Sequence, residues 1–268
     1  MGIKFVKMAG AGNDFIVIDN RGPVLTDGLA EFARLHCRRR FDVGADGVVL
    51  VEPSAAADFR MRIFNADGSE AEMCGNASRC VARFAFTRGF AKRSMTFETL
   101  AGIIKAQVDA DRVTIGMGEV GAVAAPATVK ALGREWTVHS VEAGVPHAVI
   151  FVEDLEEVPV DELGRAIRTH RHFAPRGTNV NFVQTLGGNR VGVRTYERGV
   201  EAETLACGTG SIASAVVSQE RKGVQGPPVE VEVRGGLLKV DFRKQDGRAR
   251  DVRLTGDAVF VYEGELLG

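Results

Sequence analysis

A phrase that occurs twice constrains the fold of this chain more than any other feature of the sequence. Residues 73–80 read MCGNASRC and residues 206–213 read ACGTGSIA. Each phrase places a cysteine and a glycine before an apolar run at helical spacing, which predicts a short helix that lies on a sheet. The apolar faces are Ala77, Cys80, Val81 and Phe84 in the first run and Ile212, Ala213, Val216 and Val217 in the second.

The repetition extends well beyond these two phrases. With an offset of 132 residues, RRFDVGADGVVLV (39–51) falls on RHFAPRGTNVNFV (171–183), and Asn65 falls on Glu197. One residue further in offset, Cys74 falls on Cys207. Proteins that mix helices and strands reuse similar phrases, and the identities are few, but the matched segments keep their order at a nearly constant offset. We therefore favour an internal duplication, with two similar halves about a pseudo-twofold axis and both cysteines facing one cleft.

Between these phrases, β-branched and alternating runs predict many short strands joined by glycine-rich turns. Helices are predicted at Asp27–Arg38, Ala77–Arg88, Asp161–Thr169 and Ser211–Arg221. Residues 118–130 are the most linker-like stretch and lie near the midpoint. We predict a lobe of residues 1–118 that carries Cys74 and a lobe of residues 119–268 that carries Cys207, with the extreme C-terminus returning to the first lobe.

Composition narrows the class of protein. The 268 residues carry a formal net charge of -1, with 45% hydrophobic and 26% charged residues, as in ordinary soluble proteins. The charge gives no reason to expect a nucleic-acid or membrane partner. No apolar run approaches the ~20 residues of a membrane span, and the N-terminus lacks a secretory pattern, so we expect a cytoplasmic protein. The four cysteines are too few for a disulfide framework.

A cysteine at a helix N-terminus lies beside unpaired N–H groups and a partial positive charge, which lower the pKa of a thiol. Small residues after each cysteine leave room for a carboxylate at the same N–H groups. Two opposed ends of this kind suit the inversion of a carbon beside a carboxylate. One group removes a proton from one face, and the other returns a proton to the opposite face.

The longer motifs identify a family. AGAGNDFIVID, FNADGSEAEMCGNASR, AGVPHAV, TNVNFV and YERGVEAETLACGTG together resemble diaminopimelate epimerase, in order from Met8 to Ser211. The resemblance implies a two-lobed α/β (α+β) fold, each lobe a mainly antiparallel sheet or barrel around a central helix. It implies an isomerase without a cofactor that interconverts LL- and meso-diaminopimelate for lysine and cell-wall synthesis. No metal is expected, and a homodimer is left open.

The same resemblance assigns residues. It implies that Cys74 and Cys207 are the acid/base pair and that His147 and Glu197 tune the thiols. The implied substrate-binding residues are Asn13, Asn65, Gly75, Asn76, Asn179, Glu197, Arg198, Gly208 and Thr209. An arginine can bind a carboxylate through two hydrogen bonds, as a substrate with two carboxylates requires.

Two positions depart from the family pattern. Val145 and Gly47 stand where other members carry a side-chain amide, which bears on recognition of the distal end of the substrate. Two alternatives stay open. One is a related two-cysteine racemase or epimerase that acts on proline or hydroxyproline, and the other is a non-catalytic redox or metal-binding protein. Cys37 and Cys80 are expected in the core.

Overall fold

The computed structural model describes residues 2–267 and divides into two compact units. Unit 1 comprises Met1–Gly116 and Thr255–Gly268, and unit 2 comprises Met117–Leu254. Both mix short helices with a larger number of strands, so the fold is α+β as predicted.

Unit 1 begins with two strands and then alternates strands and helices. Its elements are β1 (Ile3–Gly10), β2 (Asn13–Asp19), α1 (Leu29–His36), β3 (Gly47–Glu52), β4 (Phe59–Asn65), β5 (Glu70–Ala71), α2 (Gly75–Thr87), β6 (Ser94–Thr99), β7 (Gly102–Asp109), β8 (Arg112–Gly116) and β18 (Val259–Leu266).

Unit 2 follows the same plan. Its elements are β9 (Ala127–Ala131), β10 (Arg134–Ala143), β11 (Val145–Phe151), α3 (Val160–Arg168), the short 3-10 helix η1 (Arg171–Phe173), β12 (Asn179–Gly187), β13 (Arg190–Glu197), β14 (Ala202–Thr204), α4 (Gly208–Lys222), β15 (Val229–Val233) and β16 (Gly236–Gln245). Strand β17 (Arg248–Asp257) begins in unit 2 and ends in unit 1.

Strand pairing confirms the internal repeat. In unit 1, β2 pairs in parallel with β3, β3 pairs with β4 and β4 with β5 in antiparallel fashion, and β4 pairs in parallel with β6. In unit 2, β11, β12, β13, β14 and β15 repeat these pairings. The registers also agree, because Phe15 opposes Gly47 in unit 1 and His147 opposes Asn179 in unit 2. Both pairs are related by the 132-residue offset read from the sequence.

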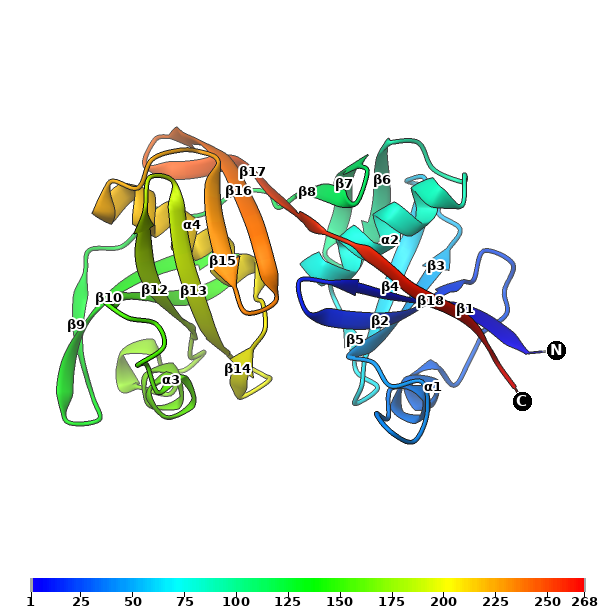
Figure 1. Cartoon of the computed structure of the whole chain (residues 1–268), viewed down its shortest axis with the longest axis horizontal. Helices are drawn as coiled ribbons and strands as arrows, with labels where there is room; N and C mark the ends of the chain where they lie inside the picture. The colour runs from blue at the N-terminus through cyan, green and yellow to red at the C-terminus, as the bar shows by residue number, and fades with distance from the viewer. Residues whose placement is uncertain (1, 268) are drawn as a thin grey trace. The chain divides into compact units, whose positions relative to one another are not determined.

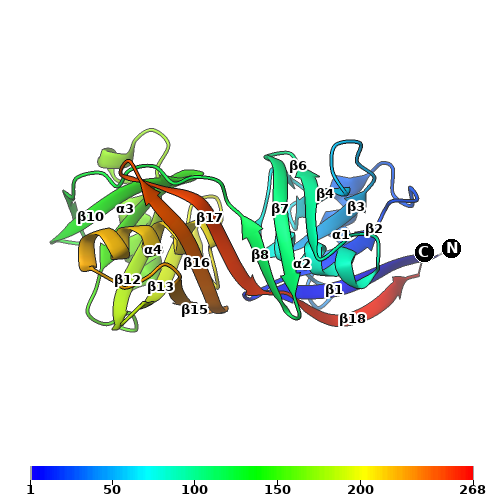
Figure 2. The ribbon, with the colours of Figure 1, turned by 90° about the horizontal axis from the view of Figure 1, so that it is seen from above.

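One helix in each unit is surrounded by strands. Helix α2 contacts β1, β2, β3, β4, β7 and β8, and helix α4 contacts β10, β11, β12, β13, β15 and β16 (Figure 1). The predicted apolar faces of both helices are buried. Helices α1 and α3 cover the other side of the same strands, where they form two further apolar cores. Strands β2, β3, β11 and β12 therefore carry continuous buried runs, as strands covered on both faces do. Figure 2 shows α2 and α4 within their own units from above.

All four predicted helices are present, but some boundaries were wrong. Helix α2 begins at Gly75 and α4 at Gly208, earlier than the predicted Ala77 and Ser211. The predicted linker also ends too late, because Ala127–Ala131 pairs with β10 as strand β9. Cys37 and Cys80 are buried in the core, as predicted.

Candidate active site

Cys74 is the N-cap residue of α2. Its backbone is extended, with φ -136° and ψ 123°, and its carbonyl accepts the first helical hydrogen bond from the N–H of Ser78 at 2.9 Å. The side chain is half-buried. The first turn of α2 contains no acidic residue, so no nearby carboxylate on the helix offsets its positive end.

Asn76 connects this helix start to the strand hairpin of unit 1. Its Nδ2 donates to Oδ1 of Asn13 at 2.6 Å, and its Oδ1 accepts from Nη2 of Arg79 at 2.7 Å. Nδ2 of Asn13 in turn donates to Oδ2 of Asp46 at 2.8 Å. Each of these bonds fixes the orientation of an amide. The side chain of Asn76 is thus held between Asn13 and Arg79.

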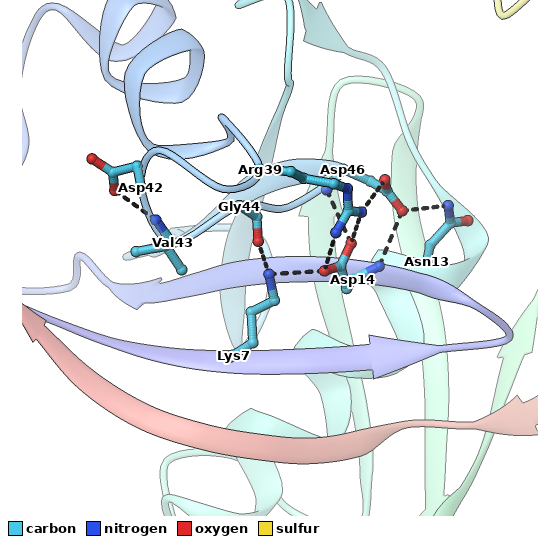
Figure 3. A network of polar contacts seen from close by, with 8 residues as sticks. All are labelled: Lys7, Asn13, Asp14, Arg39, Asp42, Val43, Gly44 and Asp46. Carbon is cyan, nitrogen blue, oxygen red and sulfur yellow. Dashed lines mark hydrogen bonds and ion pairs between the residues drawn. The ribbon is translucent and has the colours of Figure 1, made fainter.

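A charged network holds the strand that carries Asn13 (Figure 3). Nζ of Lys7 lies 2.8 Å from a carboxylate oxygen of Asp14 and also donates to the carbonyl of Gly44. Arg39 bridges Asp14 and Asp46 at 2.5 Å and 2.8 Å. Burial alone would raise the pKa of Asp14, but hydrogen bonds and charges from Arg39 and Lys7 outweigh it and hold that pKa below its ordinary value. The network thus stays charged at neutral pH.

Cys207 is the N-cap residue of α4 and is buried, with 6% of its surface exposed. Its Sγ accepts a hydrogen bond from the N–H of Gly210 at 3.4 Å and lies 3.5 Å from Oγ1 of Thr209. Its carbonyl accepts from the hydroxyl of Ser211 at 2.9 Å. The sulfur therefore faces neutral donors of its own helix.

Asn181 lies beneath the first turn of α4. A Cβ at Gly210 would stand 2.3 Å from Oδ1 of Asn181, so only glycine fits this close approach. Oδ1 also accepts from the hydroxyl of Thr195 at 3.0 Å, while Nδ2 donates to the carbonyl of Ala148 at 3.3 Å. These bonds fix which end of the amide faces His147.

His147 is almost completely buried, and its Nδ1 lies 3.1 Å from Nδ2 of Asn181. Because Nδ2 is a donor, Nδ1 is an acceptor and the imidazole proton is on Nε2. Nε2 has no hydrogen-bond partner within residues 2–267. Burial and the charge of Arg198 lower the pKa of His147 to about 3. His147 is therefore neutral at physiological pH and presents one unused N–H donor.

Asn179, Glu197 and Arg198 lie close to this histidine. His147 opposes Asn179 across β11 and β12, and Oδ1 of Asn179 accepts from the N–H of Arg198 at 2.8 Å. The guanidinium of Arg198 donates to the carbonyl of Arg176 at 3.0 Å, and no carboxylate in the described part of the chain pairs with it. Burial raises the pKa of Glu197. Unit 2 thus groups a neutral imidazole, an amide, a carboxyl group and an unpaired guanidinium.

The remaining predicted residues lie in different settings. Gly75, Gly208 and Thr209 occupy the first turns of α2 and α4 and are half-buried. Asn65 is exposed at the end of β4, where its Nδ2 donates to the hydroxyl of Ser69 at 3.0 Å within a turn. Gly47 lies in β3, and a Cβ there would stand 2.7 Å from the carbonyl oxygen of Phe64. Val145 begins β11.

Sequence reasoning missed Arg79 and Asn181. The alternation of TNVNF places residues 179 and 181 on the same face of a strand, which could have drawn attention to Asn181. Arg79 stands among buried apolar positions of its helix, an unusual place for a charge. In the described residues, no group of three or more His, Cys, Asp and Glu side chains has the arrangement of a metal site. No helix within residues 2–267 is long and apolar enough to cross a membrane.

The fold is that of a known class of proteins. A Bacillus anthracis phenazine biosynthesis protein of the PhzF family aligns over 100% of both chains with a TM-score of 0.77 and 19% identity. A probable proline racemase from Agrobacterium radiobacter K84 aligns over 99% of this chain and 93% of its own, with a TM-score of 0.70 and 16% identity. At such identities the likeness defines the fold alone.

Sequence similarity defines the family. The sequence model of diaminopimelate epimerase matches residues 5–123 and 139–261. The diaminopimelate epimerase of Aquifex aeolicus (strain VF5) is 45% identical over 98% of both chains. That of Methanothrix thermoacetophila is 46% identical over 98% of this chain and 95% of its own. The chain belongs to the diaminopimelate epimerase family, a family of isomerases.

Proposed function

We propose that the protein interconverts LL-2,6-diaminopimelate and meso-diaminopimelate, with Cys74 and Cys207 as its two acid/base groups. Its place would be in the synthesis of lysine and peptidoglycan precursors. The family match over nearly the whole chain supports the substrate. One observation supports the two-cysteine mechanism: each cysteine is the extended N-cap of the central helix of its unit, at matching points of the repeat.

The proposed proton transfers are balanced. A thiolate removes the α-proton of the substrate and becomes a thiol, while the electron pair of the broken C–H bond stays on the α-carbon beside the carboxylate. The opposite thiol then gives its proton to the other face and becomes a thiolate. The two sulfurs thus exchange protonation states in each turnover, and the reverse reaction starts from the exchanged state. No cofactor or metal takes part in this scheme.

The helix N-termini supply the stabilisation that the intermediate needs. A carboxylate next to the α-carbon accepts hydrogen bonds from the N–H groups that start α2 and α4, at Gly75 and Asn76 and at Gly208 and Thr209. Charge that develops on this carboxylate during proton removal strengthens these bonds. The N–H groups at the two helix starts thereby stabilise the transition state more than the bound substrate.

We assign the distal groups of the substrate to the remaining polar residues. Arg198 has no carboxylate partner in the part of the chain that the structure describes and is suited to bind the second carboxylate. Asn13, Asn65 and Asn179 provide amides for ammonium and carboxylate groups, and Glu197 provides an acceptor. Val145 and Gly47 carry no amide, so we expect recognition of the distal end to rely on the other residues.

His147 acts in this scheme as a neutral donor. With its pKa at about 3, it carries no charge when the enzyme works, so its effect on a thiol comes from the N–H at Nε2. Burial raises the pKa of Glu197, so its carboxyl group is protonated more readily than an ordinary glutamate. Both therefore tune the thiols through hydrogen bonding rather than through positive charge.

We further infer a cytoplasmic protein without nucleic-acid or membrane partners, for which a homodimer is the assembly to test by light scattering. The near-zero net charge supports this inference.

Incorporation of α-deuterium in D2O tests the substrate. We expect exchange with LL- and meso-diaminopimelate and none with proline, hydroxyproline or common amino acids. Exchange with proline or hydroxyproline alone would show that the substrate is a cyclic amino acid and not diaminopimelate. A lack of exchange with every amino acid tested would reject the epimerase function.

A further inference from the structure

Arg79 is a buried cation that forms no ion pair within residues 2–267. It lies in the second turn of α2 and is 0% exposed. Its guanidinium donates to the carbonyl of Asp257 at 3.1 Å, to Oδ1 of Asn76 at 2.7 Å and to the carbonyl of Gly75 at 3.4 Å. No carboxylate among residues 2–267 forms an ion pair with it. Since an uncompensated buried charge costs several kcal/mol, a cation at this position needs a reason to be there.

The acceptors of Arg79 belong to the machinery of the Cys74 helix start. Gly75 and Asn76 are the first two residues of α2, so the guanidinium holds the backbone and side chain that follow the cysteine. Asn76 transmits this order to Asn13 through the 2.6 Å bond. The cation is thus positioned just behind the turn to which a carboxylate would bind.

The charges that face Arg79 leave a net positive charge. Asp257 and Arg112 act on it with opposite signs, and the thiols of Cys80 and Cys74 also interact with its charge. Cys80 is fully buried, and desolvation raises its pKa to about 12, so it remains a thiol. Burial lowers the pKa of Arg79, yet an arginine stays protonated at physiological pH. Cys74 is therefore the ionisable partner on which this charge acts.

Unit 2 has no counterpart of this cation. Position 212 corresponds to position 79, and Ile212 is buried there with 2% of its surface exposed. Cys207 instead receives a hydrogen bond from the N–H of Gly210. The charge at position 79 is consequently a property of the Cys74 half and not a requirement of the repeated fold.

We propose that Arg79 is a positioning residue for Cys74. The buried positive charge of Arg79 stabilises the thiolate of Cys74 and so keeps this cysteine ready to act as the base. This inference rests on the proposed role of Cys74 in proton transfer. The charge acts together with the helix N-terminus, and the guanidinium also holds Asn76 in place for substrate.

Alkylation by iodoacetamide tests this directly, because only the thiolate reacts and no turnover is needed. The rate at each cysteine is followed from pH 5 to 10 by peptide mass spectrometry in the wild type and in Arg79→Gln, Arg79→Met and Arg79→Lys. We expect Arg79→Gln and Arg79→Met to raise the pH midpoint of Cys74 alkylation by about one unit and to lower its rate at pH 7 by up to about tenfold. Arg79→Lys keeps the charge, and its alkylation rate at Cys74 should stay within about threefold of the wild-type rate.

Arg83→Met is the matched control, since Arg83 is a cation of the same helix, one turn further from Cys74, and donates to the carbonyl of Ala258. It should leave the Cys74 midpoint unchanged. Circular dichroism shows which variants fold. If Arg79→Met unfolds, the test rests on Arg79→Gln, because the amide of that variant can still donate to the carbonyl of Asp257 and keep the helix in place.

Three results would overturn the inference: an unchanged midpoint in Arg79→Gln, an equal shift in Arg79→Lys, or an equal shift in Arg83→Met. The deuterium exchange experiment reports separately on the epimerase function. A shifted midpoint in a protein without exchange activity would retain the role of Arg79 and reject the function.

Discussion

The two units share one scaffold but surround their cysteines with different chemistry. Behind Cys74 lies a charged set in which Arg79 binds Asn76, and Asp14, Arg39 and Lys7 hold the neighbouring strand. Beside the Cys207 helix start lies a set of neutral side chains, next to which the guanidinium of Arg198 acts on His147. There, Asn181 contacts Gly210, Thr195 and His147, and the histidine carries no charge.

The divergence falls on the supporting positions and not on the helix caps. Arg79 corresponds to Ile212, while Asn181 and Thr195 correspond to Val49 and Ile63, all of them buried. Each unit thus has a polar group where the other has an aliphatic one. Most buried polar groups need hydrogen-bond partners, and Arg79, Asn181 and Thr195 each have them within their own unit. The comparison teaches that two equivalent helix starts can acquire different surroundings without a change of fold.

The largest expected effect concerns the cysteine at the start of the central helix, which both halves share. Cys74→Ala and Cys207→Ala should each lower the rate of epimerisation by about 10³-fold or more, because a site with one acid/base group cannot serve both faces of the α-carbon. The conversion of LL- to meso-diaminopimelate is measured by chiral chromatography. Cys37→Ala, which removes a buried thiol from the α1 core, is the control and should retain activity. Full turnover in either active-site variant would refute the two-base mechanism.

The second prediction concerns the pH dependence that the buried His147 gives to unit 2. The pKa of His147 is about 3 in the folded state, below its ordinary value near 6.5, so the unfolded chain binds the proton more tightly. Its contribution to stability is complete above pH 6.5 and is lost as pH falls toward 3. In urea unfolding, His147→Gln should reduce the stability difference between pH 7 and pH 4 by up to about 3 kcal/mol.

His172→Gln is the control for this pH effect, since His172 is exposed. It should leave the pH dependence of stability as in the wild type. An equal change in both variants would show that the effect does not come from the burial of His147.

A third experiment exchanges the residues in the first turns of α4 and α2. Gly210→Ala should destabilise the protein by about 1–3 kcal/mol, because the new Cβ would lie 2.3 Å from Oδ1 of Asn181. In an ordinary helix the same change stabilises by up to about 1 kcal/mol, so the sign is decisive. Ala77→Gly at the matching position of α2 should cost about 1 kcal/mol through helix propensity and up to about 0.8 kcal/mol more through the loss of a buried methyl group. Urea unfolding measures both, and a stabilising Gly210→Ala would contradict the close contact.

The smallest effect is expected in the network of Figure 3. Arg39 is more than half exposed, so Arg39→Gln should cost no more than about 1 kcal/mol despite its two ion pairs. A rise in KM with unchanged kcat would accompany this change if the network orients Asn13 for substrate. A loss of several kcal/mol would mean that the network is a main source of stability in unit 1.

The sequence predicts those parts of the structure that depend on local patterns. The glycine after each cysteine and the apolar spacing that follows are enough to predict α2 and α4, and the offset of 132 residues predicts the matching strand registers. Strands β1, β6, β7, β10 and β17 were not predicted; in each of them charged or polar residues stand between a few apolar ones, so no long apolar run marks the strand.

The supporting residues of the site could not be predicted, because their partners are distant in the chain. Arg79 binds the carbonyl of Asp257, which lies 178 residues further on, and no local pattern links the two. Gly210 reads as an ordinary glycine until Asn181 is placed against it. The protonation state of His147 likewise depends on complete burial, which a proline and a valine beside it do not reveal.

The late return of the chain to unit 1 bears on how the protein is made. Strand β1 pairs with β18, and Arg79 and Arg83 donate to carbonyls at Asp257 and Ala258. During translation, every partner within unit 2 is synthesised before these last residues emerge from the ribosome. The second half can therefore complete its fold while the first half still lacks the strand beside β1, and a truncation before Asp257 would remove two contacts of the helix that Cys74 begins.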